Sequence, residues 1–112
     1  MRFNILQMRR VEAETFSGIV EEKGQVLRTL SYDELVRLMN EPVTEVLVGK
    51  RKGQVAVIVE VCEGDRLRIV VQGFINAFER FPMIKGVALH GFYKHRDGAI
   101  TEMRNEEFYG YD

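Results

Sequence analysis

Residues 43 to 73, VTEVLVGKRKGQVAVIVEVCEGDRLRIVVQG, contain three strand-like segments separated by two glycine-containing turns. A three-residue loop over residues 63 to 65 aligns aliphatic side chains on one face, in the pairs Val61–Leu67, Val59–Ile69 and Val57–Val71. The same register sets Glu60 opposite Arg68 on the other face, as a favourable cross-strand ion pair. A two-residue loop would exchange the faces and put arginines beside valines. The sequence therefore predicts an antiparallel meander as the core of the fold.

The neighbouring turns extend this sheet in both directions. A four-residue turn, residues 50 to 53, is expected to bring Val46 and Val48 onto the aliphatic face. A second hairpin is expected over residues 84 to 103. Its turn, Asp97-Gly98, is typical of type I′ geometry.

Two short helices are predicted to pack on one face of the sheet. Ser31 and Glu34 form a capping-box pattern at the start of a helix over residues 31 to about 40. Residues 74 to 81 carry three phenylalanines and an alanine at helical spacing, which predicts the second helix. The fold class is α+β, with a mostly antiparallel sheet.

The segment from residue 11 to residue 22 is ambiguous. Val11, Thr15 and Ile19 fit one helical face, whereas Gly18 and the β-branched residues favour a strand. We favour a strand from Thr15 onward, with a hairpin turn at residues 23 and 24.

Composition indicates one soluble domain spanning residues 1 to 112. Hydrophobic residues make up 46% and charged residues 29% of the chain, as in ordinary globular proteins. No run approaches the roughly 20 apolar residues of a membrane span, and no signal peptide is visible. Cys62 is the only cysteine, which excludes an intramolecular disulfide and fits a reducing compartment. We expect a cytoplasmic protein, with Cys62 as a small core residue.

Charge is distributed unevenly along the chain. Residues 1 to 49 carry 6 basic and 8 acidic groups, residues 50 to 96 carry 9 and 4, and residues 97 to 112 carry 1 and 5. The net charges are therefore −2, +5 and −4, which sum to −1. A basic middle segment permits an electrostatic partner site, although a pI near 6.1 is low for a dedicated nucleic-acid binder.

The first candidate site is basic. Side chains at two turns could bind a ligand or clamp phosphates, namely Lys50, Arg51, Lys52, Arg66 and Arg68. An ordinary solvated surface explains the same residues. No aromatic residue lies between positions 43 and 73, so the platform on which single-stranded nucleic acid stacks is missing there.

The second candidate site would matter only if the protein is an enzyme. A small nuclease or hydrolase needs a proton shuttle and cations, and the residues of those types are His90, Tyr93, His95 and Arg96. By strand alternation His90 points away from Tyr93 and His95, so convergence would require a bulge at Gly91. The alternative is a semi-buried His90 and a solvated His95.

The third candidate site is the acidic aromatic tail, residues 105 to 112, NEEFYGYD. Phe108, Tyr109 and Tyr111 could dock on a basic partner or on the basic segment of a second copy. Alternatively the tail folds over its own sheet. No spacing fits a metal site, a phosphate loop or a dinucleotide fingerprint, so no metal and no cofactor are expected.

These observations favour a small binding or adaptor protein, not an enzyme. We expect it to self-associate, most simply as a dimer, and to engage a protein or a small anionic ligand. The alternatives are nucleic-acid binding through the basic hairpins and hydrolysis at the histidine strand. No membrane partner is expected.

Overall fold

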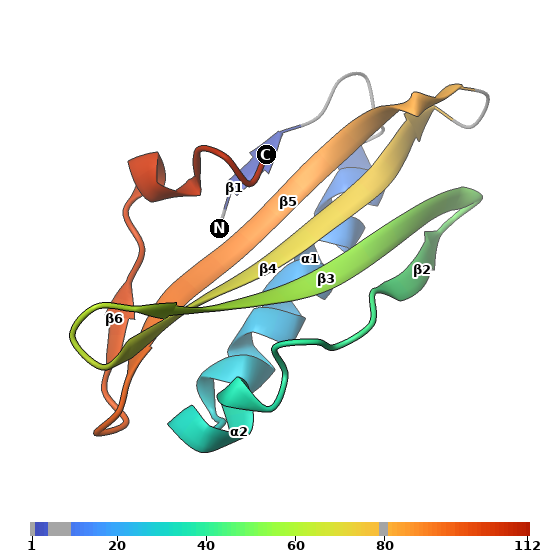
Figure 1. The fold of residues 1–112 in the computed structure, drawn as a ribbon. Coiled ribbons are helices and arrows are strands. Elements are labelled where there is room, and N and C mark those ends of the chain that lie inside the picture. The colour runs from blue at the N-terminus through green and yellow to red at the C-terminus, as the bar shows by residue number, and fades with distance from the viewer. Residues whose placement is uncertain (1, 5–9, 79–80) are drawn as a thin grey trace.

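The computed structural model describes residues 2–4, 10–78 and 81–112 (Figure 1). Its elements are β1 (Arg2–Asn4), α1 (Arg10–Arg28), α2 (Tyr32–Val36), β2 (Thr44–Val48), β3 (Arg51–Cys62), β4 (Arg66–Phe78), β5 (Phe81–His95), β6 (Ile100–Glu102) and a 3-10 turn (Asn105–Phe108). The strands form one antiparallel sheet in the order β1-β5-β4-β3-β2, and β6 pairs with β5 outside this path. The predicted α+β class is confirmed.

The central register is the one that the sequence predicts. Val57, Val59 and Val61 of β3 lie opposite their expected partners in β4. Arg68 Nη2 donates to Glu60 Oε2 at 3.0 Å across the same two strands. The pair Cys62–Arg66 flanks the three-residue loop, within which Gly64 and Asp65 have φ values of 79° and 54°. Alternation of side chains thus determines which face is aliphatic.

The first turn of the meander is shorter than expected. Val48 pairs directly with Arg51, so Gly49 and Lys50 alone form the turn, and the predicted four-residue turn is wrong. Gly49 has a φ of 62°, which suits the first central position of a type II′ turn. The register differs from the predicted one by an even number of residues. Val46 and Val48 therefore stay on the aliphatic face, where both join the core.

The turn at Asp97-Gly98 has three loop residues and is not of type I′. His95 donates its backbone N–H to the Ala99 carbonyl at 2.8 Å, and Gly98 donates to the His95 carbonyl at 2.9 Å. Gly98 lies at a φ of 95°. This is the pattern of a type I turn followed by a residue in the left-handed region.

The preferred strand from Thr15 onward is wrong, because residues 10 to 28 form one helix. Its buried stripe is Phe16, Val20, Gly24 and Leu27, at helical spacing. The predicted turn at residues 23 and 24 is wrong too. Gly24 lies inside the helix, where its missing side chain makes room for His90: an added Cβ would be 2.1 Å from the imidazole Cδ2.

The predicted helix over residues 74 to 81 is also wrong, since β4 continues to Phe78. Phe74 pairs with Gln54 of β3 and Val87 of β5. This two-sided pairing outweighs the helical spacing of the aromatic residues. Residues 79 and 80 of the prediction lie outside the described residues.

The first predicted helix exists in a shorter form. Glu34 N–H donates to Ser31 Oγ at 3.1 Å, and Ser31 N–H donates to Glu34 Oε1 at 3.0 Å. This is the capping box that the sequence predicts. The helix ends at Val36, and turns replace the expected helical residues up to Asn40.

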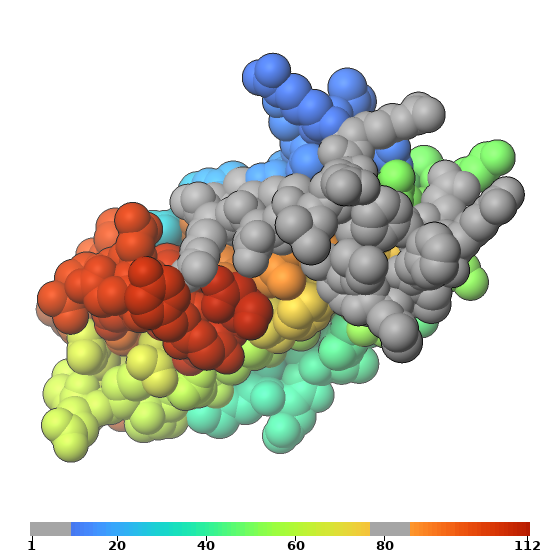
Figure 2. Space-filling model, turned by 90° about the horizontal axis from the view of Figure 1, so that it is seen from above, coloured from blue at the N-terminus to red at the C-terminus, as the bar shows by residue number. Residues whose placement is uncertain are grey.

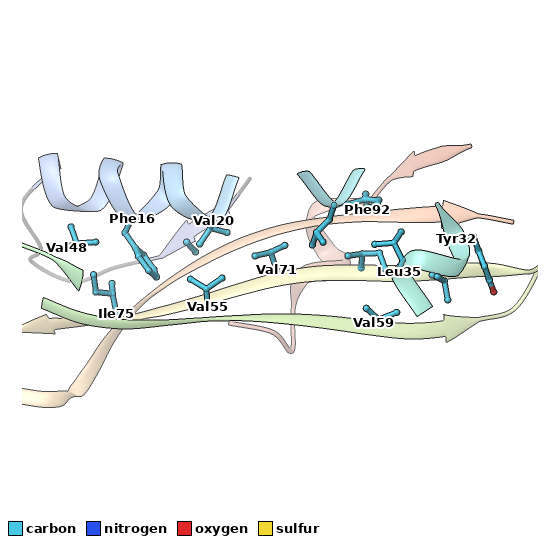
Figure 3. Close-up of a cluster of buried hydrophobic side chains, with 14 residues drawn as sticks. Phe16, Val20, Tyr32, Leu35, Val48, Val55, Val59, Val71, Ile75 and Phe92 are labelled. Carbon is cyan, nitrogen blue, oxygen red and sulfur yellow. The ribbon is translucent and has the colours of Figure 1, made fainter. Parts of the chain in front are cut away.

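Two cores lie on the two faces of the sheet. The larger one is between the sheet and both helices, and Figure 3 shows Phe16 and Val20 of α1 directed towards Val55, Val71 and Ile75. The smaller one lies on the other face, beneath the C-terminal residues. Figure 2 shows these residues, in red, beside the yellow-green β3–β4 turn. The sheet is therefore covered over much of both faces.

Candidate functional site: a cavity at the open end of the sheet

The C-terminal residues cover only part of the face that lies away from α1. Met103 and Phe108 are buried there, with Tyr111 packed beside them near the β3–β4 turn. At the other end of the same face, β2, β3 and β4 surround a cavity of about 790 Å³. This volume is within the range of small-molecule sites.

Three neighbouring strands supply the cavity walls. The lining residues are Glu45, Val46, Leu47, Lys52, Gly53, Gln54, Phe74 and Asn76. Cross-strand pairing explains the grouping, because Leu47 lies opposite Lys52 and Gln54 lies between Glu45 and Phe74. The site thus rests on paired β-strand backbone and not on a loop.

The cavity combines an apolar wall with accessible polar groups. Leu47 is 69% exposed, and Phe74 is half-buried. Lys52, Gln54 and Glu45 are exposed, and no hydrogen bond or ion pair joins these three side chains to other described residues. An ammonium, an amide and a carboxylate are therefore available to a ligand beside aliphatic and aromatic surface.

The predicted basic site is distributed over distant positions. Lys50 occupies the β2–β3 turn and Lys52 lines the cavity. Arg66 and Arg68 of β4 pair with Cys62 and Glu60 at the opposite end of β3, which has 12 residues and so spans roughly 36 Å. These four side chains do not converge on one phosphate.

The arginines of the predicted basic site have partners inside the chain. Arg51 is buried, and its Nε donates to Glu12 Oε2 of α1 at 2.8 Å. The guanidinium of Arg66 lies 4.1 Å from the centre of the Tyr93 ring. Arg68 is held by Glu60, as described above. Only Lys50 and Lys52 of the five predicted residues project as free cations, within the part of the chain that the structure describes.

His90 is buried in a polar network between α1 and β5. Arg28 Nε donates to His90 Nε2 at 2.9 Å, and His90 Nδ1 lies 2.9 Å from Glu21 Oε2. An arginine is always a donor, so Nε2 accepts and Nδ1 carries the proton that Glu21 accepts. Arg28 also forms two hydrogen bonds to Glu102, at 2.6 and 2.7 Å.

This network occupies both nitrogens of the imidazole. A general base needs a free lone pair within reach of a substrate, and Arg28 takes that position at Nε2. A hydrogen bond from Gln25, and a second one from His90, lower the pKa of Glu21, so the carboxylate stays charged. The arrangement links helix to sheet and leaves no open reaction centre at His90 among the described residues.

The other histidine-strand residues lie on different surfaces. Tyr93 is buried on the face opposite His90 and donates to Glu107. Burial raises the pKa of the Tyr93 phenol, and its hydrogen bond to Glu107 raises it further. His95 contacts Thr101 Oγ1 at 2.7 Å, whereas Arg96 lies over the Tyr32 ring at 4.7 Å. The four residues do not form one constellation, because the register of β5 runs through position 91 without a bulge.

The acidic aromatic tail folds onto its own sheet. Phe108 is 6% exposed, and the Tyr111 phenol donates to Glu60. Of the three predicted interface rings, that of Tyr109 points outward, at 68% exposure. The interface role of all three residues stays a prediction. Cys62 is half-buried against the smaller core.

Sequence reasoning found Lys52 but missed the other cavity residues. The available signal was Leu47, an aliphatic residue at a position where strand alternation predicts a polar one. In the described residues no group of three or more His, Cys, Asp or Glu side chains could hold a metal ion. Nor does any described helix have the length and apolar character to cross a membrane.

Comparisons with protein families, with curated proteins and with solved structures gave no match to this chain.

Proposed function

We propose that this protein is a non-catalytic binding protein whose cavity takes a small anionic ligand with an apolar body. The observation that carries this proposal is the exposed Lys52 ammonium on the wall of a cavity of about 790 Å³, beside Leu47 and Phe74. Ligand sites combine apolar walls with a few polar groups that fix orientation. The cavity has both features.

Each wall suits a different part of such a ligand. A carboxylate, sulfonate or phosphate would accept from Lys52, with Gln54 as a neutral donor beside it. The apolar body would pack on Leu47 and Phe74. Glu45 would accept from a ligand hydroxyl or amine.

Binding is supported better than the two alternatives. Nucleic acid needs a continuous basic track, whereas the basic residues lie at opposite ends of β3 and three of them have internal partners. Hydrolysis needs an accessible base, whereas Arg28 occupies Nε2 of His90.

The test uses anilinonaphthalene sulfonate, a fluorescent anion with an aromatic body. Lys52→Gln should weaken its binding about tenfold, which corresponds to about 1.4 kcal/mol. Lys50→Gln removes the same charge from the neighbouring turn, outside the cavity lining, and should leave the Kd nearly unchanged. Because this dye also binds partly unfolded states, each variant should keep the wild-type circular dichroism and urea midpoint. Equal affinities for the two variants, or no binding by the native protein, would refute the proposal.

A further inference from the structure

One edge of the sheet is incomplete. β2 pairs with β3 only as far as Val55, while β3 runs on to Cys62. Residues 56 to 62, seven in all, have no strand beside them on this edge among the described residues. Figure 1 shows β3 continuing well past the end of β2 towards the β3–β4 turn. The sequence of residues 56 to 62 is AVIVEVC, in which Glu60 is the one charged residue and Val61 is 65% exposed.

The hairpin geometry determines which backbone groups face the free edge. Val48 and Arg51 close a two-residue turn, and the closing pair of such a hairpin exchanges backbone hydrogen bonds. Hydrogen bonds alternate between the two sides of a strand in an antiparallel sheet. The odd-numbered residues of β3, including Val57, Val59 and Val61, therefore direct their N–H and C=O groups outward, away from β4.

We propose that this edge binds a second copy of the chain, through antiparallel pairing of residues 56 to 62 with a two-fold axis at Val59. This register fills the gap completely, because Val59 is the midpoint of the seven free residues. It also sets outward-directed residues opposite one another, Val59 with the partner's Val59 and Val57 with the partner's Val61. A register centred on Glu60 would instead set two glutamates directly opposite, which is unfavourable.

The side chains on the helix-covered face are complementary in this register. Val57 lines a second cavity of about 200 Å³, which is bounded by Leu38 and Pro42 of the loop before β2. The partner's Val61 is placed beside Val57, at the mouth of this cavity. The most exposed apolar side chain of the edge therefore meets a hollow lined mostly by apolar residues, with Lys23, Glu41 and Thr44 as its polar members. The same contact occurs twice about the axis.

The identity of the occupant follows from this self-complementarity. An unprotected aliphatic edge pairs readily with another strand, and the available strand that matches its length is its own. Glu60 is already neutralised by Arg68, so it adds no unpaired charge to the contact. The result is one continuous sheet across both copies, with the helices of both on one side.

A designed crosslink tests the register. In the proposed dimer Ala56 lies opposite Cys62 of the partner subunit, at a non-hydrogen-bonded position where Cα atoms are about 4.5 Å apart, a distance that a disulfide can span. Within one chain the two positions are roughly 20 Å apart. Ala56→Cys should therefore yield a covalent dimer under copper phenanthroline oxidation, and its peptide map should show the introduced thiol joined to Cys62.

Two controls make the crosslink specific. Wild type has only Cys62, and the double variant Ala56→Cys/Cys62→Ser has only the introduced thiol; in both, the equivalent thiols are roughly 20 Å apart across the axis and should not crosslink. Equal crosslinking in the double variant, or none in Ala56→Cys, would overturn the proposed register. If the edge paired with an added extended peptide and no covalent dimer formed, the occupant would be a different one. That result would equally overturn the proposed pairing of two copies.

Oligomeric state gives an independent measurement. Wild type should be dimeric by analytical ultracentrifugation at about 100 μM, well above the micromolar Kd of a weak specific pair. Val61→Lys places a charge at the contact and should give a monomer, with unchanged circular dichroism because Val61 is exposed in the single chain. Lys50→Gln, on the turn away from this edge, should remain dimeric. A monomeric wild type would refute the interface without affecting the proposed ligand site.

Discussion

Arg28 donates to Nε2 of His90 at 2.9 Å, and this contact positions the imidazole against Gly24 of α1. The ring lies where a Cβ at residue 24 would be. A glycine in a helix interior is therefore required here by packing. The same histidine that the sequence offered as a catalytic base joins the long helix to the sheet.

Gly24→Ala should lower the free energy of unfolding by about 1–3 kcal/mol, because the new methyl group overlaps the His90 ring. Helix propensity alone would predict a gain of about 1 kcal/mol. In a His90→Ala background the overlap is absent, so the same substitution should be neutral or stabilising. A double-mutant cycle in urea measures this coupling.

The matched control is Gly18→Ala, because nothing described lies within 4 Å of an added Cβ at this position of the same helix. This substitution should stabilise the protein by about 0.5–1 kcal/mol. An equal loss at both glycines would show that His90 does not occupy the space beside residue 24.

Arg51→Ala should lower the free energy of unfolding by about 1.5–3 kcal/mol, because it removes a charged hydrogen bond to Glu12 beneath α1. Lys52→Ala, at the next residue, should change it by less than about 0.5 kcal/mol. Urea unfolding compares the two variants. Equal effects would contradict the inward placement of Arg51.

Phe108→Ala should cost about 3–5 kcal/mol, since it removes a buried aromatic ring from the smaller core. Tyr109→Ala removes a ring that is exposed and should cost less than about 0.5 kcal/mol. Thermal and urea unfolding provide the measurement. If both variants unfold like wild type, the tail does not cover the sheet in solution.

Burial, together with the hydrogen bond to Glu60, raises the pKa of Tyr111 to about 12. The folded protein therefore holds this proton more tightly than the unfolded chain, whose tyrosines titrate near pH ~10. The contribution of Tyr111 to stability is complete below about pH 10 and is lost as the pH rises towards about 12. Urea unfolding at several alkaline pH values should follow this loss.

Tyr111→Phe should remove the phenolate transition near pH 12 from the absorbance titration and flatten the alkaline loss of stability. The hydrogen bond from Tyr111 is also the main cause of the lowered pKa of Glu60. In this variant the pKa of Glu60, followed by NMR, should therefore rise towards its ordinary value. An unchanged Glu60 titration would show that the contact between the two side chains is not formed.

Local patterns in the sequence predicted the parts of the fold that depend on neighbouring residues. The register from Val57 to Val71 follows from strict alternation, because a slip of one residue would bury Arg68 and expose the valines. The capping box at Ser31 and Glu34 closes within one helical turn. The charge pair of Glu60 and Arg68 follows from the same register.

The elements that the sequence mispredicted depend on distant residues. Residues 10 to 28 carry mixed local signals, and the helix is stabilised by packing of Phe16 and Val20 on a sheet that lies much later in the chain. Phe74 has helical spacing to its neighbours, but it lies in a strand because β3 and β5 pair on both sides of it. Packing on the sheet in the first segment, and strand pairing in the second, outweigh weak local propensity.

The sequence by itself determined the α+β class and the central meander, because hydrophobic alternation and turn chemistry act over a few residues. Only the tertiary structure decided the site. It turned Arg51 inward to Glu12, closed His90 between Glu21 and Arg28, and left Lys52 exposed beside Leu47. These contacts depend on which distant side chain packs beside a charged group, and the spacing of residues along the chain does not predict that.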